Sequence, residues 1–176
     1  MDFSQHCEFA KNKTMEEHKR IILVGPAGSG KDFIRNKFRE KGYKVDVSYT
    51  TRPPREGEEN GIDYKFISAE QFAGRVYNGM FYECVQHGKF HYGTGLSEWQ
   101  ECDVFIMETD GVKHITSYDR QNCLIIYVNT PFDTRLKRLR DRGWSDEKIS
   151  DRVQVDHEKF RNFNNYDFEI SSEAHD

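Results

Sequence analysis

The fold is decided by residues 21–32, which read Ile21-Ile22-Leu23-Val24-Gly25-Pro26-Ala27-Gly28-Ser29-Gly30-Lys31-Asp32. The first four residues are an apolar run that predicts a fully buried strand. The glycines that follow let backbone N–H groups turn inward toward phosphate oxygens, and Lys31 adds a cation for the β- and γ-phosphates. A helix is predicted next, from near-helical apolar spacing at Phe33, Ile34 and Phe38 and an end signal at Lys41-Gly42. The segment therefore indicates a phosphate-binding loop, or P-loop, between a strand and a helix.

The last position of this motif departs from the usual pattern. A P-loop normally ends in Ser or Thr, whose hydroxyl binds Mg²⁺, but here the position is Asp32. A carboxylate at about 4 Å from a phosphate charge is repelled by about 4 kcal/mol at an effective dielectric near ~20. A Mg²⁺ ion between them reverses that sign, because carboxylates are good Mg²⁺ ligands. We expect Asp32 to be a Mg²⁺ ligand, and we expect the ATP phosphates to be held by Gly25, Pro26, Ala27, Gly28, Ser29, Gly30, Lys31 and Asp32.

Size and composition limit the classes of protein. A chain of 176 residues supports one domain, and a net charge of −4 with mixed signs argues against broad nucleic-acid binding. The 4 cysteines are scattered without a Cys-x-x-Cys motif, and no signal peptide or membrane-length apolar run is visible, so we expect reduced thiols in a cytoplasmic protein. We expect a monomer or homodimer with no membrane partner. Residues 1–18 are polar and aperiodic, which predicts a flexible N-terminal arm.

Five short apolar runs recur along the chain, and helical patterns separate several of them. They are Ile21–Val24, Val45–Val47, Val104–Met107, Leu124–Val128 and Phe168–Ile170. Strands that alternate with helices predict an α/β fold with a parallel sheet covered on both faces. Ligands of such sheets bind at the carboxyl ends of the strands, which is where the P-loop lies.

Residues 48–94 break this rhythm and predict an inserted subdomain. Turn signals occur at Arg52-Pro53-Pro54-Arg55 and Asn60-Gly61, followed by short aromatic runs and one helix near 69–78. Two arginines three residues apart in a rigid turn can present fork-shaped donors to one phosphate. Taken alone, such a pair is more often two solvated loop residues.

The whole of residues 48–66 favours the phosphate interpretation, because it resembles the signature of guanylate kinases. Thr-Thr-Arg, Pro-Arg, Gly-Glu, Gly-x-Asp-Tyr and a following Phe occur in the family's order. The resemblance continues to about residue 170. It includes Phe81-Tyr82-Glu83, Gly88, Tyr92-Gly93-Thr94, the acidic segment 108–112, the basic residues Arg138, Arg142-Gly143 and Arg152, and the strand at 166–170.

The resemblance implies a role for each matched residue. Arg52, Arg55, Tyr64 and Tyr92 would grip the GMP phosphate, and Ser48, Glu83 and Thr94 would read the guanine edge. Glu108 and Asp110 would complete the GMP site near the phosphates and metal. Lys31, Arg142 and Arg152 would be the catalytic residues, the two arginines closing over the transferred phosphoryl group. Arg138 is either catalytic or an ion-pair partner on the helix surface, and His87 and His91 are predicted to be ordinary loop residues.

Together these features predict a P-loop kinase of the guanylate kinase type within a single domain, residues 1–176. Residues 48–94 would be the GMP-binding subdomain and 141–151 the lid, and the enzyme would transfer the γ-phosphoryl group of ATP to GMP or dGMP with Mg²⁺. One alternative is a catalytically inactive guanylate-kinase-like binding module. Another is a related P-loop kinase with a different phosphorylated acceptor. The segment at 108–111 is about two residues shorter than the family pattern, and the last residues also differ, so the resemblance does not define the whole adenine pocket.

Overall fold

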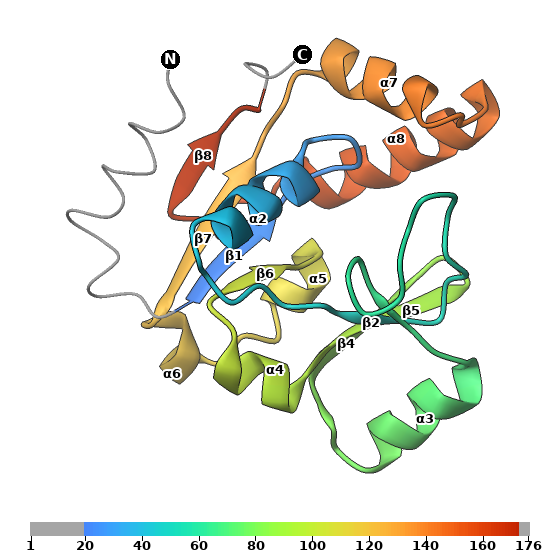
Figure 1. The fold of residues 1–176 in the computed structure, drawn as a ribbon. Helices are drawn as coiled ribbons and strands as arrows, with labels where there is room; N and C mark the ends of the chain where they lie inside the picture. The colour runs from blue at the N-terminus through green and yellow to red at the C-terminus, as the bar shows by residue number, and fades with distance from the viewer. Residues whose placement is uncertain (1–19, 173–176) are drawn as a thin grey trace.

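A computed structural model describes residues 20–172, and two four-stranded sheets organise it (Figure 1). The first sheet is parallel throughout and has the order β6-β1-β7-β8. Its strands are β1 (Arg20–Val24), β6 (Val104–Ile106), β7 (Cys123–Val128) and β8 (Phe168–Ile170). The predicted α/β class, with helices flanking a parallel sheet, is confirmed. The predicted arm at 1–18 lies outside the described residues.

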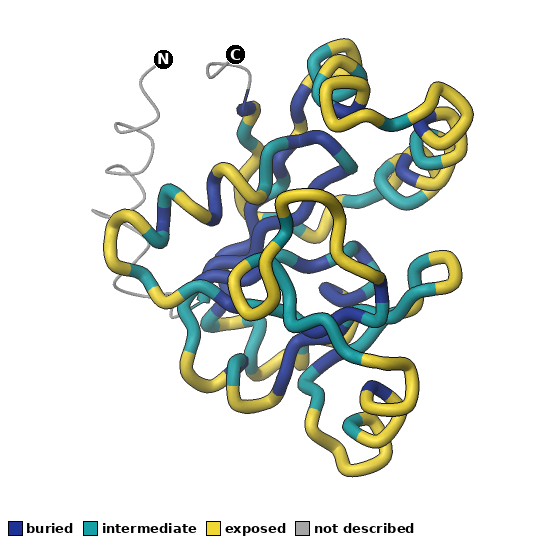
Figure 2. The backbone as a smooth tube through the Cα atoms, turned by 45° about the vertical axis from the view of Figure 1, so that its right-hand side comes forward, coloured by how far each residue is buried: buried dark blue, intermediate teal, exposed yellow. Residues whose placement is uncertain are grey.

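Helices cover both faces of this sheet. They are α2 (Lys31–Glu40), α4 (Leu96–Glu101), α5 (Thr109–Val112), α6 (Ser117–Arg120), α7 (Phe132–Asp141) and α8 (Asp146–Phe160). Successive side chains of β1 point to opposite faces. Ile21 and Leu23 therefore join one core cluster with α2, whereas Ile22 and Val24 join another with Trp99 of α4. Figure 2 shows that the central strands are the most deeply buried part of the chain.

The predicted strand at 45–47 is wrong. Val45 forms only an isolated parallel bridge to Val104, and the next residue donates its N–H to the Val104 carbonyl at 2.8 Å. That residue is Asp46, whose buried carboxylate accepts a hydrogen bond from Ser48 Oγ at 2.5 Å. The backbone leaves the first sheet here and enters the second.

The second sheet has the order β3-β2-β5-β4 and lies below the first in Figure 1. Its strands are β2 (Tyr49–Thr50), β3 (Lys65–Phe66), β4 (Phe81–His87) and β5 (Phe90–Gly95), and α3 (Ala69–Tyr77) follows β3. A two-residue turn joins β4 to β5, and its first residue is Gly88 with φ +59°. A positive φ at this position is what a tight hairpin requires. The independent movement of this region as a subdomain stays a prediction.

Helices α7 and α8 form a pair on the opposite side of the P-loop from the second sheet (Figure 1). Residues 142–145 join them, and Ser145 caps α8 by accepting from the Lys148 N–H at 3.3 Å. The predicted lid at 141–151 covers the end of α7, this turn and the start of α8. Within residues 20–172, no helix is both long enough and apolar enough to span a bilayer.

The central position of β7 gives a stability prediction. Ile125 is 0% exposed and packs in the second core cluster. Ile125→Ala should lower the free energy of unfolding by about 2–5 kcal/mol, because it removes buried methyl groups and leaves a cavity. Urea unfolding checks this, with an unchanged m-value expected. Tyr77 is 91% exposed, so Tyr77→Ala is the control and should change stability by less than about 0.5 kcal/mol. Equal losses in the two variants would contradict the packing described here.

Candidate active site

The P-loop connects β1 to α2, and its conformation depends on two glycines. Gly28 has φ +76° and Gly30 has φ +94°, angles that residues with a Cβ rarely adopt. A Cβ at Gly28 would lie 2.9 Å from the Arg135 carbonyl oxygen, and one at Gly30 would lie 2.4 Å from Ser172 Oγ. Glycine is therefore required at both positions for conformation and for space.

Lys31 lies at the first position of α2 and folds back onto the loop. Its Nζ donates to the carbonyl oxygens of Gly25 at 2.6 Å and Pro26 at 3.1 Å. Burial lowers the pKa of Lys31, and the charges of Glu108 and Asp32 oppose that effect. The loop's own carbonyls thus hold the ammonium at the place where a phosphate would meet the N-terminus of the helix.

Two arginines converge on one carboxylate on the other side of the cleft. Arg52 is buried and donates from both terminal nitrogens to Glu58, at 2.8 and 2.9 Å. The Arg55 N–H donates to the same carboxylate at 2.7 Å, and the Arg52 guanidinium lies 5.3 Å from the centre of the Tyr64 ring. Burial raises the pKa of Glu58, but its hydrogen bonds with Arg52 and Arg55 outweigh this and hold the pKa below its ordinary value. The turn therefore binds an anion that belongs to the chain itself, the carboxylate of Glu58.

Glu83 supplies a buried carboxylate with one unsatisfied oxygen. Its Oε1 accepts from Thr94 Oγ1 at 2.8 Å and from the Thr94 N–H at 3.2 Å. Its Oε2 is buried and has no hydrogen-bond partner among the described residues. Burial raises the pKa of Glu83 to about 7, although the bonds from Thr94 act in the opposite direction. An unpaired buried acceptor is costly unless a ligand satisfies it, so Oε2 is a candidate contact for a donor.

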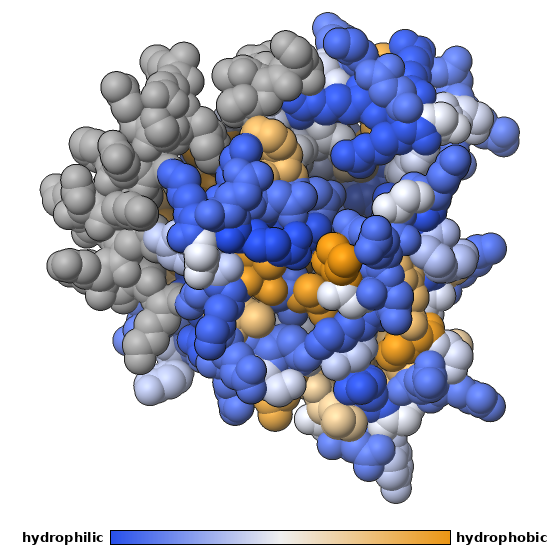
Figure 3. Space-filling model, in the orientation of Figure 1, coloured by the Kyte–Doolittle hydropathy of each residue, from blue (hydrophilic) through white to orange (hydrophobic). Residues whose placement is uncertain are grey.

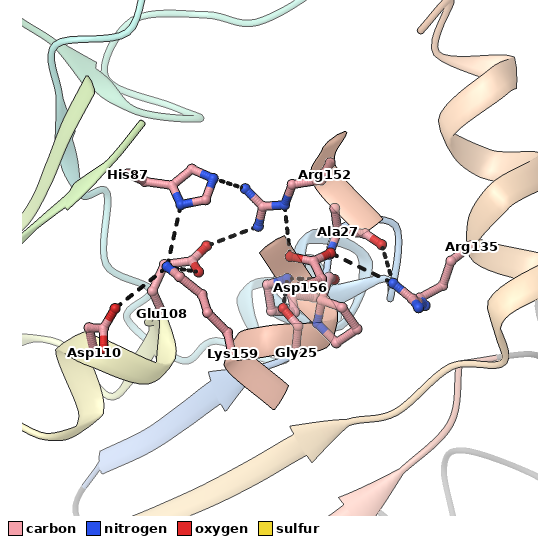
Figure 4. Close-up of polar contacts among 11 residues, drawn as sticks. Gly25, Ala27, His87, Glu108, Asp110, Arg135, Arg152, Asp156 and Lys159 are labelled. Atoms are coloured by element: carbon pink, nitrogen blue, oxygen red, sulfur yellow. Dashed lines mark hydrogen bonds and ion pairs between the residues drawn. The ribbon is translucent and has the colours of Figure 1, made fainter. Parts of the chain in front are cut away.

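A network of charges links α8 to the P-loop (Figure 4). Asp156 is buried and accepts from the Ala27 N–H at 2.8 Å and from Arg152 Nε at 2.8 Å. Arg152 also lies 3.4 Å from a carboxylate oxygen of Glu108. Burial alone would raise the pKa of Glu108, but Arg152, Lys31 and Lys159 outweigh it and hold the pKa below its ordinary value. The network holds the start of the P-loop, the end of β6 and α8 together.

One cleft collects most of the residues that the sequence singled out. Its lining includes Ala27, Gly28, Ser29, Gly30, Lys31, Asp32, Ser48, Arg52, Arg55, Tyr64, Glu83, Tyr92, Glu108, Arg142 and Arg152. Hydrophilic residues surround a hollow on this face, and hydrophobic ones show through at its middle (Figure 3). The cleft brings segments from the whole length of the chain to one place, although the role of each residue stays a prediction.

Four predicted residues lie outside the cleft lining. Gly25 and Pro26 act through the carbonyls that hold Lys31. Thr94 is 0% exposed and lies behind Glu83, so its contacts orient that carboxylate. Asp110 lies in α5, where it pairs with Lys113 at 2.7 Å and with Lys159 at 3.6 Å. The short segment at 108–111 thus directs only its first carboxylate into the cleft.

The sequence interpretation missed two cleft residues with polar or aromatic rings. The prediction that His87 and His91 are loop residues is wrong, because they lie on β4 and β5, and His87 lines the cleft. Strand alternation from Glu83 would have placed Val85 and His87 on the same face. Trp144 also lines the cleft, and the Arg55 guanidinium lies 5.2 Å from its ring centre.

Arg138, for which two roles were left open, supports the P-loop from behind. It donates to Ser172 Oγ and to the Ser172 carbonyl, each at 2.8 Å, and to the Gly28 carbonyl at 3.3 Å. Ser172 in turn donates to the Ser29 carbonyl at 2.6 Å. These bonds attach the segment after β8 to the phosphate-binding loop.

Asp32 has the exposure that a magnesium ligand requires. Its side chain is 55% exposed at the start of α2, and one oxygen lies 3.5 Å from an Arg35 nitrogen. Within the described residues, no group of 3 or more His, Cys, Asp and Glu side chains is arranged to hold a metal. Mg²⁺ does not need such a group, because it is commonly held by one or two carboxylates together with phosphate oxygens and water. Asp32 beside Lys31 fits that mode of binding.

The pairing of Arg52 with Glu58 gives a prediction about anions. Glu58→Gln should lower the free energy of unfolding by about 3–5 kcal/mol, because it leaves a buried guanidinium without its counter-charge. Inorganic phosphate should restore more of the Tm of this variant than it adds to the wild type, since an anion can replace the lost carboxylate.

Differential scanning calorimetry with increasing phosphate measures both effects. The control is Glu40→Gln, because Glu40 is 62% exposed and pairs only with Lys37 at 2.8 Å among the described ion pairs. That variant should stay within about 0.5 kcal/mol of the wild type at every phosphate concentration. If phosphate raised the Tm of all three proteins equally, Arg52 would not lie at an anion site.

Comparison with known proteins agrees with this geometry. The family model described as guanylate kinase matches residues 17–176. The guanylate kinase of Mycoplasmopsis pulmonis (strain UAB CTIP) is 36% identical over 172 residues, covering 88% of each chain, and that of Latilactobacillus sakei is 31% identical over 164 residues, covering 85% of this chain and 79% of its own. A crystal structure of guanylate kinase from Anaplasma phagocytophilum has a TM-score of 0.60 at 21% identity, covering 89% of this chain and 77% of that one, which supports the fold. The chain therefore belongs to the guanylate kinase family of nucleoside monophosphate kinases.

Proposed function

We propose that the chain transfers the γ-phosphoryl group of ATP to GMP or dGMP in the presence of Mg²⁺. Family membership supports the kinase class, and the buried Glu83 carboxylate with an unpartnered oxygen supports guanine as the acceptor base. Guanine carries N1–H and an exocyclic amine as adjacent donors. A carboxylate matches that edge, whereas adenine would bring an unprotonated N1 against it.

The donor phosphates would bind at the P-loop. Lys31 would exchange the carbonyls of Gly25 and Pro26 for phosphate oxygens, and the loop N–H groups with the N-terminus of α2 would complete the cradle. Asp32 would hold Mg²⁺, which neutralises charge on the β- and γ-phosphates and orients them. This arrangement aligns the terminal phosphate with the open part of the cleft.

The acceptor phosphate would bind at the arginine turn. Arg52 and Arg55 now share the Glu58 carboxylate, so the phosphate of GMP would take over part of these contacts. The hydroxyl groups of Tyr64 and Tyr92 would complete its shell, since both residues line the same cleft. Burial raises the pKa of Tyr64, so its phenol stays protonated and acts as a donor at neutral pH.

Ser48 and Glu83 would select the base. Thr94 fixes one oxygen of Glu83 and leaves the other without a partner, so that it would accept from the guanine donors. The Ser48 hydroxyl donates a hydrogen bond to Asp46 at 2.5 Å, so its oxygen would present lone pairs to the cleft. A site built on such polar contacts can reject the wrong base by about 10⁴-fold.

Transfer would occur between the two phosphates, with charge stabilised by arginine. Arg142 and Arg152 line the cleft from the α7–α8 side, and Glu108 lies beside Arg152. We include in the proposal that residues 48–94 and 141–151 close over the substrates. Closure would exclude water that otherwise hydrolyses ATP, and positioning with charge neutralisation would provide the rate acceleration.

A coupled ADP-release assay with GMP, dGMP, AMP, UMP and CMP as acceptors tests the proposal. Turnover with GMP or dGMP and little with the other three is expected. No turnover with any acceptor, together with GMP binding in calorimetry, would favour the inactive binding module. Preference for another acceptor would favour a related kinase.

Lys31→Met tests the donor side. The substitution should lower kcat by about 10³-fold or more, because it removes the cation that faces the transferred phosphoryl group, while GMP binding should persist. Steady-state kinetics give kcat, and isothermal titration of GMP gives the acceptor affinity. Near-normal turnover in this variant would contradict the P-loop assignment.

Glu83 gives a pH prediction with a defined sign. Its pKa of about 7 means that the carboxyl group binds a proton as the pH falls below 7, whereas the guanine donors need the carboxylate. The KM for GMP should therefore decrease by up to about tenfold from pH ~6 to pH ~8 and then stay constant. Initial rates at saturating ATP across this range measure the effect.

Glu83→Gln is the matched control, because it keeps the shape and does not titrate. It should lose this part of the pH dependence, and it should lower kcat/KM for GMP by about 1.5–3 kcal/mol. Titration of the GMP phosphate affects the wild type and the variant alike. The ratio of their KM values at each pH therefore reports the titration of Glu83 alone. A loss of AMP and GMP use in equal proportion, or an unchanged pH profile, would contradict the role of Glu83 in reading guanine.

A further inference from the structure

His87 joins the second sheet to the lid helix across the cleft. It is the last residue of β4, and the tight turn at Gly88 fixes its backbone. Its Nε2 contacts a terminal nitrogen of Arg152, and its Nδ1 lies 3.3 Å from Lys159 Nζ (Figure 4). Both of these partners come from α8, so the imidazole connects two parts of the chain that lie on opposite sides of the P-loop.

The chemistry of the two partners defines the state of the ring. Arginine and lysine only donate hydrogen bonds, and a neutral imidazole has one acceptor nitrogen and one N–H. Nε2 can accept from Arg152 only in the tautomer that carries its proton on Nδ1. Lys159 then cannot donate to Nδ1, and its charge is balanced instead by Glu108 at 3.4 Å and Asp110 at 3.6 Å.

The charged surroundings favour this neutral ring. Arg152 and Lys159 face it from α8, Glu108 and Asp156 lie further along the same network, and Tyr92 of β5 contacts it with ring centres 6.5 Å apart. Burial lowers the pKa of His87 from 6.5, Arg152 lowers it further, and Glu108 opposes them. The contact between neutral His87 and Arg152 is therefore complete above the His87 pKa. It is lost as the pH falls through that pKa, because the protonated ring is a third cation.

We propose that neutral His87 is a positioning residue for Arg152, holding the guanidinium over the cleft from the acceptor side. Asp156 and Glu108 fix the other two edges of the same guanidinium, at 2.8 and 3.4 Å. With His87 in place, all three nitrogens of the Arg152 guanidinium have a partner, and these partners come from three segments of the chain. The Arg152 guanidinium is correctly oriented only when the β4–β5 hairpin and α8 lie together, so closure of the acceptor side also aligns this catalytic arginine. This inference rests on the proposed function.

Kinetics of two His87 variants test the role. His87→Ala should lower kcat at about pH 8 by about tenfold with little change in either KM, a smaller loss than the ~10²-fold that a 1 Å misplacement can cause. His87→Gln should retain most of the kcat, because its amide oxygen can accept from Arg152. As the pH falls from about 8 through the His87 pKa, kcat at saturating GMP should fall more in the wild type than in His87→Gln, since only the imidazole titrates.

His91 provides the matched control from the same hairpin. Its ring packs against Phe72 in a tilted arrangement with centres 5.4 Å apart, and it does not line the cleft. His91→Gln should keep the wild-type kcat and the wild-type pH profile. A purely structural effect of losing a histidine from this hairpin would appear in both positions.

An NMR titration of the imidazole signals separates this inference from the proposed function. In the ligand-free protein, His87 should titrate below 6.5, and Arg152→Gln should raise its pKa. If the wild type were inactive, the proposed function and the kinetic role of His87 would both be wrong. The titration would still show whether His87 contacts Arg152. A wild-type kcat in His87→Ala, an acid limb identical in wild type and His87→Gln, or a His87 pKa insensitive to Arg152→Gln would each overturn the inference.

Discussion

The hydrogen bond from the Ala27 N–H to the Asp156 carboxylate is the interaction on which the rest of the site depends. It joins residues 129 positions apart, with a donor–acceptor distance of 2.8 Å. Asp156 is 2% exposed, so its charge requires the donors around it. The same carboxylate binds Arg152 and lies 3.7 Å from an Arg135 nitrogen. One buried anion thus sets the path of the P-loop and the position of α8 together.

Three cationic groups of the cleft are compensated from within the chain. Lys31 contacts backbone carbonyls, Arg52 pairs with Glu58, and Arg152 pairs with Asp156 and Glu108. Such internal partners keep buried charges from standing alone, which would be strongly destabilising. Glu83 differs, because its second oxygen has no partner among the described residues. The cleft therefore combines cations that have internal counter-charges with one buried acceptor that has no partner among the described residues.

Much of the fold followed from local patterns. The buried strand β1, the glycine turn and the helix α2 were predicted together, because apolar runs, glycine conformations and helical spacing are properties of neighbouring residues. The arginine turn and Glu83 were found through the family resemblance, and they line one cleft with the P-loop. The strand predicted at 45–47 is wrong because the Asp46 carboxylate accepts a hydrogen bond from Ser48. The hydrophobic pattern of the sequence does not reveal this contact. The prediction for His87 was wrong because the residue is the last one of β4 rather than part of a loop.

The sequence by itself determined the phosphate-binding loop, the parallel α/β sheet and the kinase family, because each is specified by residues close together in the chain or by a signature in fixed order. Only the tertiary structure decided which charges meet. Asp156 with Ala27, His87 with Arg152 and Ser172 with Ser29 are contacts between segments that no local pattern relates. Side-chain pairing over such separations depends on how the two sheets and the helix pair α7–α8 are placed around β1. That placement is set by burial of the two cores, and the geometry of the site follows from it.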